Sequence, residues 1–303
     1  IYIYTYIYIY MDLMHTRHFL GLCQSMDIIV KNRRHVIYNK SWDDAKLIFI
    51  KTEMITFFID NLMNSINQTV NIVIGNADIT FPNNIDKRFG VGQIPKKLLE
   101  KLINNPFINK IFVENLDSYL PKTYPIPLGI NTNESPANLT YFEEFYNINI
   151  DKPLKFTNFN RNRNGKGQWE ERGDVLKLCN TAWSEYYINT KPQKHNTYLK
   201  KMGENLFTIC VHGGGLDVNP KLWEALLIGV IPIIRENKPY TNIYTENDLP
   251  VVIVKEWSNN TITHDNLLKW KNKYYNYFTN KEKRNKMLEI LSLDYWVKYI
   301  SAI

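Results

Sequence analysis

The most constraining feature of this sequence is an apolar run that passes through three glycines into a short helix and then into a second apolar run. Residues 207–211 (FTICV) predict a strand, and His212-Gly213-Gly214-Gly215 predicts a flexible turn. Asn219-Pro220 predicts a helix N-cap followed by the first helical residue, and Gly229 predicts the helix end. Residues 230–234 (VIPII) predict the next strand. This order is typical of an α/β fold with parallel strands.

The rest of the chain continues the alternation of strands and helices. Strands are predicted at 27–30, 46–50, 70–74, 110–113, 154–158 and 250–254, and helices at 53–66, 94–104, 169–179 and across most of 266–301. The 303 residues, 44% of them hydrophobic, suit two domains of ordinary size. We expect a first domain at 11–150, a linker within 131–152 and a second domain at 151–303. The last helix is a candidate to pack back on the first domain.

The first ten residues, IYIYTYIYIY, need separate treatment. Their alternation leaves neither face of a strand for solvent, and ten residues are too few to span a membrane. Because an alternating AT repeat reads in frame as Ile-Tyr, we interpret residues 1–10 as a non-native or low-complexity leader from an AT-rich genome. A start at Met11 is then expected, with no secretory signal or spanning helix after it.

Charge and cysteine usage narrow the class of protein. The net charge of +7 and pI near 9.0 are compatible with anionic partners, but the basic residues are spread along the chain, as on an ordinary solvated surface. Cys23, Cys179 and Cys210 are far apart and form no CxxC pair, which argues against a disulfide framework or a zinc site. A soluble protein of a reducing, cytoplasmic compartment is expected.

The loop from His212 to Asn219, which includes Asp217, is the strongest candidate for chemistry. The amides of Gly213, Gly214 and Gly215 can approach a phosphate between a strand and a helix. The alternative is a plain tight turn. Three residues apart on the following helix, Lys221 can meet a pyrophosphate and Glu224 can accept bonds from ribose hydroxyls. The alternative is a surface ion pair between Lys221 and Glu224. The apolar residues on both sides of Glu224 in the sequence argue against it.

The segment from His212 to Ile234 resembles the donor-binding signature of exostosin-like glycosyltransferases: a glycine turn, a basic residue, Trp-Glu-Ala, Gly-x-x-Pro and an apolar strand. Residues 249–254 and Trp257 also fit this pattern. In the first half, residues 75–78 (GNAD) and 125–130 (PIPLGI) resemble the acceptor-side domain of these enzymes. The similarity is specific around the glycine turn and faint elsewhere.

The resemblance implies a GT-B architecture, in which two Rossmann-like domains face each other across a cleft that holds the sugar nucleotide. It also implies transfer with inversion, usually from a UDP-sugar, to a glycan or glycoprotein acceptor. Two features depart from the family. Relatives are commonly membrane-anchored, and the basic residue that is commonly Arg is Lys221 here, which keeps the charge but loses the bidentate fork.

The residues agree with a transferase that needs no metal and no cofactor beyond its nucleotide-sugar substrate. The chain has no Asp-x-Asp pair to hold a divalent ion, so the diphosphate must be neutralised by protein. Candidates are Lys221, the glycine amides and the loop with Arg161, Arg163 and Lys166, which joins a strand and a helix of the second domain. The alternative for that loop is a solvated charged segment.

An inverting transfer also requires a base on the other side of the cleft. Asp78, which follows a strand ending at Gly75, is the candidate for the proton of the acceptor hydroxyl. Its alternative is a turn residue. His212 is a candidate contact for the donor phosphate or sugar, with a purely structural role as its alternative.

Other functions were weighed on the same residues. An esterase would pair His-Gly-Gly-Gly with a Gly-x-Ser-x-Gly elbow, which is absent, and no Walker motif occurs. A basic nucleic-acid-binding protein would gather its tyrosines and basic residues on one surface, whereas the 20 tyrosines are scattered. An inactive GT-B scaffold remains as a third alternative.

Overall fold

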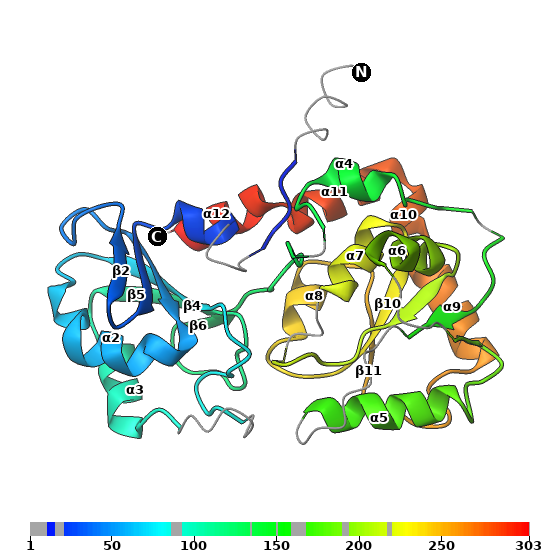
Figure 1. Ribbon diagram of the computed structural model, residues 1–303, viewed down its shortest axis with the longest axis horizontal. Helices are drawn as coiled ribbons and strands as arrows, with labels where there is room; N and C mark the ends of the chain where they lie inside the picture. Colours follow the sequence, from blue (N-terminus) through cyan, green and yellow to red (C-terminus); the bar gives the residue numbers. More distant parts are fainter. Residues whose placement is uncertain are drawn as a thin grey trace, which may run out of the picture.

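The computed structural model describes residues 11–15, 21–85, 93–133, 135–149, 151–158, 168–189, 194–216 and 220–302. Within them the chain forms two α/β units side by side, each built on its own sheet (Figure 1). The fold class predicted from the sequence, α/β with two parallel sheets in one chain, is therefore confirmed. Two such units are the basis of the GT-B architecture.

The first unit is a sheet with strand order β2-β1-β3-β4-β5-β6, in which every pair is parallel except the β1–β2 hairpin. Its strands are β1 (Ile28–Asn32), β2 (His35–Tyr38), β3 (Leu47–Lys51), β4 (Val70–Gly75), β5 (Ile108–Val113) and β6 (Thr123–Pro125). All residues of β4 are buried, as expected of a central parallel strand covered on both faces.

The two faces of the first sheet pack in different hydrophobic cores. Ile48 and Ile50 of β3 belong to one apolar core with residues of α2 (Ile55–Asn61) and α3 (Lys96–Ile103), whereas Phe49 belongs to a second core that extends into the other unit. Short 3-10 turns flank this region: η2 (Gly21–Ser25), η3 (Thr52–Met54) and η4 (Met63–Ser65). Because β3 alternates in this way, one strand contributes to both cores.

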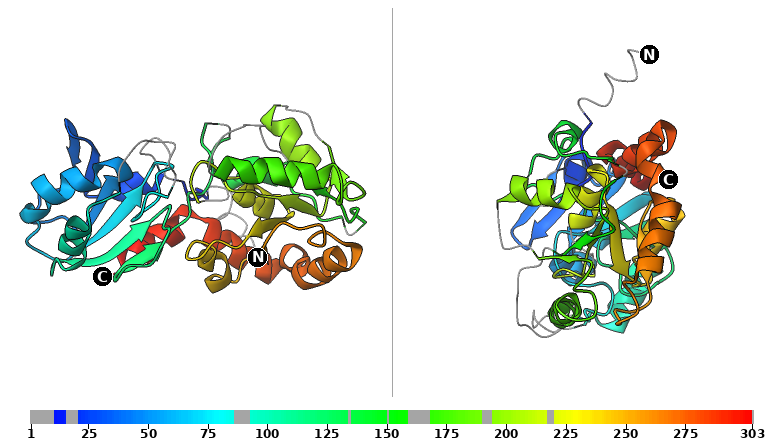
Figure 2. Two further views of the ribbon diagram at one scale, coloured as in Figure 1. Left: turned by 90° about the horizontal axis from the view of Figure 1, so that it is seen from below. Right: turned by 90° about the vertical axis from the view of Figure 1, so that its right-hand side faces the viewer.

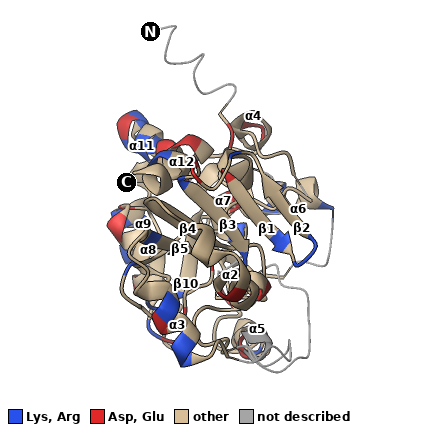
Figure 3. Cartoon of the chain, turned by 90° about the vertical axis from the view of Figure 1, so that its left-hand side faces the viewer, with Lys and Arg blue, Asp and Glu red and all other residues tan. Residues whose placement is uncertain are grey.

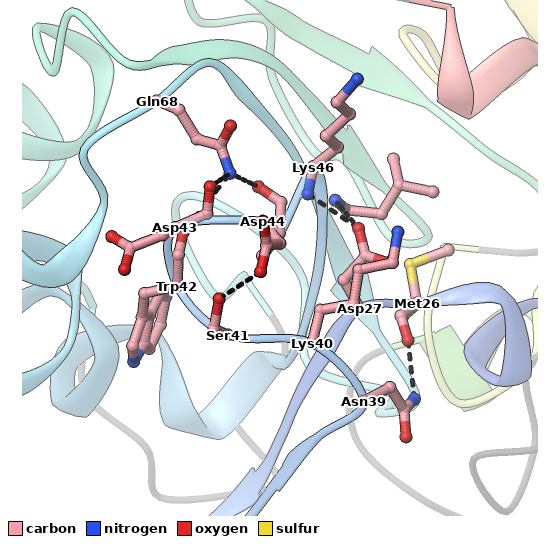
Figure 4. Close-up of polar contacts among 12 residues, drawn as sticks. Met26, Asp27, Asn39, Lys40, Ser41, Trp42, Asp43, Asp44, Lys46 and Gln68 are labelled. Atoms are coloured by element: carbon pink, nitrogen blue, oxygen red, sulfur yellow. Dashed lines mark hydrogen bonds and ion pairs between the residues drawn. The ribbon is translucent and has the colours of Figure 1, made fainter.

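Asp27, just before β1, ties the loop after β2 to the sheet (Figure 4). Its carboxylate accepts hydrogen bonds from the amides of Lys46 and Leu47 at 2.7 and 2.9 Å and pairs with Lys40 at 2.9 Å. Burial works against ionisation, but these partners outweigh it and lower the pKa of Asp27. The contacts join residues about twenty positions apart, so they brace the amino-terminal edge of the sheet.

The second unit has strand order β11-β10-β9-β7-β8, all parallel. Its strands are β7 (Phe156–Thr157), β8 (Tyr187–Ile188), β9 (Phe207–Ile209), β10 (Ile231–Arg235) and β11 (Val252–Val254). In chain order this is the 2-1-3-4-5 arrangement of doubly wound folds, in which the winding direction reverses between the first and third strands. The topological switch point therefore lies between β7 and β9.

Helices surround the second sheet and one of them returns to the first. They are α4 (Leu139–Glu143), α5 (Gln168–Cys179), α6 (His195–Gly203), α7 (Lys221–Leu227), α8 (Asn242–Glu246), α9 (His264–Tyr274), α10 (Asn276–Thr279), α11 (Lys281–Leu291) and α12 (Leu293–Ser301). From α11 the chain runs through α12 to end beside the first unit, as two views show (Figures 1 and 2). The side chain of Asn71 in β4 donates to the Ile300 carbonyl at 2.7 Å.

Several details differ from the sequence-based expectations. Pro220 is the N-cap of α7 and not its first helical residue, and Asn219 lies outside the described residues. The expected linker contains α4, whose Leu139 and Phe142 are buried. The hairpin strand β2 and the helix α6 were not predicted, because their apolar positions are few. The leader at 1–10 also lies outside the described residues.

Candidate functional site

The glycine turn lies at the switch point of the second sheet. β9 ends at Ile209, so residues 210–216 leave its carboxyl end, next to the carboxyl end of β7. Open α/β sheets bind ligands in the crevice outside the carboxyl ends of the strands at such a point. The basic loop with Arg161, Arg163 and Lys166, which follows β7 in sequence, lies outside the described residues, as do Asp217 and Asn219.

A largely enclosed carboxylate, that of Glu171 on α5, whose side chain is 10% exposed, contacts side chains from the carboxyl ends of three strands. Its Oε2 contacts His212 Nδ1 at 2.6 Å, and its Oε1 accepts from Arg235 Nε at 2.9 Å and from the indole of Trp257. Burial works against ionisation, but His212 and Arg235 outweigh it and lower the pKa of Glu171 to about 2. On the other side of its ring, His212 Nε2 lies 3.4 Å from the amide of Asn237.

These contacts decide what each member of the Glu171 cluster can offer a ligand. His212 is 1% exposed, and its ring is held by Glu171, so its orientation is set by the protein. The side chain of Arg235, in contrast, is 40% exposed. Only its Nε is bound to Glu171, and within the described part of the chain its two terminal nitrogens have no hydrogen-bond partner. That free fork matches the geometry of a phosphate group.

Two further basic groups lie behind the glycine turn. Arg172 Nε donates to the backbone carbonyl of His212 at 3.2 Å, which holds the start of the turn. Lys221 is buried, and its Nζ donates to the Ile209 carbonyl at 3.2 Å, at the carboxyl end of β9. Burial lowers the pKa of Lys221 to about 8. Lys221 therefore contributes positive charge beneath the turn and is shielded from solvent.

The glycine turn also meets the first unit. A Cβ placed on Gly214 would lie 1.8 Å from Asp78 Oδ2, and one on Gly215 would lie 2.3 Å from Asn115 Oδ1. The amide of Leu216 donates to that same Asn115 oxygen at 2.9 Å. Asp78 follows β4 and Asn115 follows β5, so loops from the carboxyl ends of both sheets meet here. Only glycine permits this approach at 214 and 215.

Glu224, in contrast, is directed toward α6. It is 4% exposed, and its two oxygens contact His195 Nε2 at 2.9 Å and the hydroxyl of Tyr198 at 2.8 Å. The hydroxyl of Tyr141 lies 3.0 Å from the other ring nitrogen of His195. Each oxygen of Glu224 therefore has one protein partner, and because a carboxylate oxygen can accept more than one hydrogen bond, the ribose contact expected of Glu224 stays a prediction.

The sequence analysis missed Glu171, Arg172, Arg235 and Asn115 as site residues. Weak signals for them exist. Arg235 ends an apolar strand, and Glu171 and Arg172 stand early in a helix that follows a basic loop. Polar residues where parallel strands end or helices begin face the ligand-binding edge of an α/β sheet. Charge at such positions was the signal that could have selected them.

Metal and membrane features are absent from the described residues. They contain no group of three or more His, Cys, Asp or Glu side chains able to hold a metal ion. Among the described helices, none has both the length and the apolar content needed to cross a bilayer.

Charge on the surface is mixed in sign. Figure 3 shows basic positions on α3 and α11 with acidic positions beside them. In α3, for example, Lys96 and Glu100 form an ion pair at 3.7 Å. A nucleic-acid-binding surface would instead concentrate one sign of charge along a face or helix. This side of the molecule does not favour that alternative.

No family model matches the sequence, and no curated protein is similar to it. Solved structures with a similar fold include TarM, with 13% identity, a TM-score of 0.44, and coverage of 87% of this chain and 55% of that one. The pneumococcal O-GlcNAc transferase GtfA, solved with UDP and GlcNAc, has 10% identity, a TM-score of 0.37 and coverage of 88% and 61%. The GtfA/B complex has 9% identity, a TM-score of 0.38 and coverage of 90% and 63%. The chain thus spans less than two thirds of each, and no activity follows from likenesses this distant.

Proposed function

We propose that this protein is a glycosyltransferase that binds a nucleotide-sugar donor, UDP-linked, at the switch point of the second sheet. One observation supports this above all others. The glycine turn leaves β9 at the switch point and meets Asp78 and Asn115 from the carboxyl ends of the first sheet. Phosphate-binding backbone, basic side chains and a carboxylate of the opposite unit therefore converge in one place.

The donor diphosphate would be bound by positively charged side chains and by backbone amides that donate hydrogen bonds. The exposed guanidinium of Arg235 offers two terminal nitrogens, and Glu171 links Arg235 to His212, which is followed in sequence by Gly213 to Gly215. Lys221 adds charge from beneath the turn. With these groups and the loop at 161–166, the diphosphate is neutralised by protein, so the proposed reaction needs no metal ion.

The proposed chemistry is transfer with inversion to a glycan or glycoprotein hydroxyl. The acceptor oxygen forms a bond to the anomeric carbon as the bond from that carbon to the diphosphate breaks. Asp78 takes the acceptor proton, and the charge left on the diphosphate is stabilised by Arg235 and the turn amides. The position of the Asp78 carboxylate against Gly214 supports this role, because it brings a carboxylate of the first unit to the glycine turn.

Glu224 has a positioning role in this proposal. Its bonds to His195 and Tyr198 hold α7 against α6, and α7 carries Lys221 one turn earlier. Glu224→Ala should therefore lower stability more than it lowers the affinity for UDP. A loss of UDP affinity of about tenfold or more with unchanged stability would instead restore the ribose contact expected from the sequence.

Binding is tested by calorimetric titration of UDP into the wild type and the Arg235→Ala variant. Loss of a charge-assisted contact should weaken binding by about 10- to 100-fold. Arg33→Ala, an exposed arginine in the β1–β2 turn, is the matched control and should bind like the wild type. Equal UDP affinity in both variants, or no UDP binding by the wild type, would refute the proposed donor site.

Catalysis is tested separately with Asp78→Asn and a panel of UDP-sugars. Transfer or hydrolysis should fall by about 100-fold or more, because a general base contributes that much, while UDP affinity stays within about twofold. The anomeric configuration of the product, read by proton NMR, should be inverted relative to the donor. A retained configuration, or full activity in Asp78→Asn, would reject Asp78 as the base. UDP binding with no turnover on any sugar would indicate an inactive scaffold.

A further inference from the structure

A cavity lies between the two units at the edge strand of the first sheet, and no residue of the glycine turn lines it. Its volume is about 430 Å³, within the usual range of small-molecule sites. One wall comes from β6 and the loop before it, and the other from α8 and α12. The side chain of Asn242 donates to the hydroxyl of Tyr119 across this boundary at 2.8 Å. Domain interfaces are frequent positions for ligand sites.

Four of the eleven residues that line this cavity are aromatic. Tyr119, Tyr124 and Tyr299 line it and are 51%, 39% and 40% exposed, so their rings remain accessible to a ligand. Tyr124 and Tyr299 both pack on the buried ring of Phe112, with ring centroids 5.7 and 5.5 Å from it. Tyr299 also stacks on Tyr295 and packs against Trp296, so neighbouring rings restrain both tyrosines, and the exposed parts of their rings and hydroxyls can bind a ligand without a large loss of side-chain freedom.

The charged groups at the cavity do not favour an anionic ligand. Of the two charged lining residues, Lys122 directs its ammonium to the carbonyls of Asn105 and Ile108, at 3.0 and 2.7 Å. Glu246 has no hydrogen-bond or ion-pair partner among the described residues, so its carboxylate is available to accept bonds. Burial, Glu246 and the neighbouring tyrosines raise the pKa of Tyr299, which keeps its hydroxyl protonated as a donor.

We propose that this cavity binds a neutral saccharide. The apolar C–H face of a sugar ring packs on an aromatic ring, while its hydroxyls need donors and acceptors around the rim. Tyr124 and Tyr299 supply the rings, and Glu246 and the tyrosine hydroxyls supply the polar partners. This site goes beyond the proposed function, because it requires neither a nucleotide nor catalysis.

The test is ligand-observed saturation-transfer NMR with maltose, lactose and diacetylchitobiose. At least one should bind the wild type, and Tyr299→Ala or Tyr124→Ala should weaken binding by about tenfold or more through loss of a stacking surface. Glu246→Gln should weaken it by about threefold, because a neutral amide accepts weaker bonds. Tyr38→Ala, an exposed tyrosine on β2, is the matched control and should have no effect.

Thermal unfolding of each variant shows whether it is folded. If an alanine variant unfolds, Tyr299→Phe keeps the ring and should retain binding within about threefold, while Glu246→Gln still tests the polar partner. Absence of binding by all three sugars, binding that survives Tyr299→Ala, or tighter binding of choline at the same residues would each overturn the proposal. UDP affinity should be unchanged in Tyr299→Ala, so failure here is distinct from failure of the donor site.

Discussion

The two sheets of this protein are built from similar parts but wound differently. The second sheet reverses its winding direction between β7 and β9, and the glycine turn lies at that point. In the first sheet the parallel strands follow each other in chain order, β1-β3-β4-β5-β6, with no reversal. A reversal separates two neighbouring loops and opens a crevice between them, so only the second sheet provides a ligand site of this kind. The first sheet contributes loops that face it.

The same difference appears in two carboxylates whose side chains are each 10% exposed. Asp27 and Glu171 each have a lowered pKa because hydrogen-bond and ion-pair partners outweigh burial. Asp27 lies at the amino edge of the first sheet and binds mainly backbone amides, so it braces a loop. Glu171 lies at the carboxyl edge of the second sheet and orients His212 and Arg235. The lowered pKa thus accompanies a structural role for Asp27, whereas Glu171 orients side chains of the proposed donor site.

Among the substitutions that test this difference between the two sheet edges, Glu171→Ala should have the largest effect. Removing the carboxylate takes away the partner of His212 and of the partly exposed Arg235, and the lowered pKa of Glu171 corresponds to a loss of about 3 kcal/mol in the free energy of unfolding. UDP binding should be lost with it. In the wild type the stabilisation from Glu171 is complete above its ordinary pKa of 4.5 and disappears as the pH falls toward about 2.

Urea unfolding from pH 7 to pH 3 measures the Glu171 effect. The difference between wild type and Glu171→Ala should shrink as the solution becomes acidic. Asp174→Asn, an exposed carboxylate on the same helix, is the control and should change stability by less than about 0.5 kcal/mol. A Glu171→Ala variant as stable as the wild type would show that the cluster is not what holds this edge together.

Lys221→Met tests the second sheet edge further, because it removes the buried charge next to the glycine turn. Because the pKa of Lys221 falls from 10.5 to about 8 on folding, its ammonium opposes folding below pH 8, and that penalty fades as the pH rises to 10.5. At about 1.4 kcal/mol per pKa unit the penalty is roughly 3 kcal/mol. The variant should be more stable at neutral pH, lack this rise between pH 8 and 10.5, and bind UDP more weakly. Higher UDP affinity in the variant would contradict a role for Lys221 with the diphosphate.

Asp27→Asn tests the amino-terminal edge of the first sheet, where we propose no ligand site. The amide can still accept one of the backbone bonds but loses the ion pair with Lys40, so we expect a loss of about 1–2 kcal/mol in stability. The contribution of Asp27 should disappear as the pH falls below about 4, because its folded pKa is lowered. UDP affinity should stay within about twofold by calorimetry. A larger change would mean that the two units are coupled through the first sheet.

The smallest effect is expected from Gly173→Ala on α5. No atom lies within 4 Å of an added Cβ there, so the substitution should stabilise the helix by about 0.5–1 kcal/mol and leave UDP binding unchanged. Gly214→Ala is the informative partner, because its Cβ would lie 1.8 Å from Asp78 Oδ2. It should be destabilising and weaken UDP binding. If both variants behave alike in a thermal melt, the contact between the units is looser than the structure indicates.

Local pattern was enough to predict most of the elements. The apolar runs at 70–74 and 110–113 form β4 and β5, because strongly apolar segments satisfy local and tertiary preferences together, and the helix predicted at 169–179 is α5. In α6 only Leu199, Met202 and Gly203 are buried, so its residues carry little periodic signal. β2 is only half-buried and was missed for the same reason.

By itself, the sequence determined the α/β class and the place where a strand passes through glycines into a helix, since both depend on the spacing of neighbouring residues. Tertiary structure decided which side chains reach that place. Glu171 and Glu224 are both acidic residues on helices. Glu171 contacts His212, 41 positions away, whereas Glu224 contacts His195 on α6, a helix that the sequence did not predict. Strand order and helix packing bring such distant residues together, and neither depends on local pattern alone.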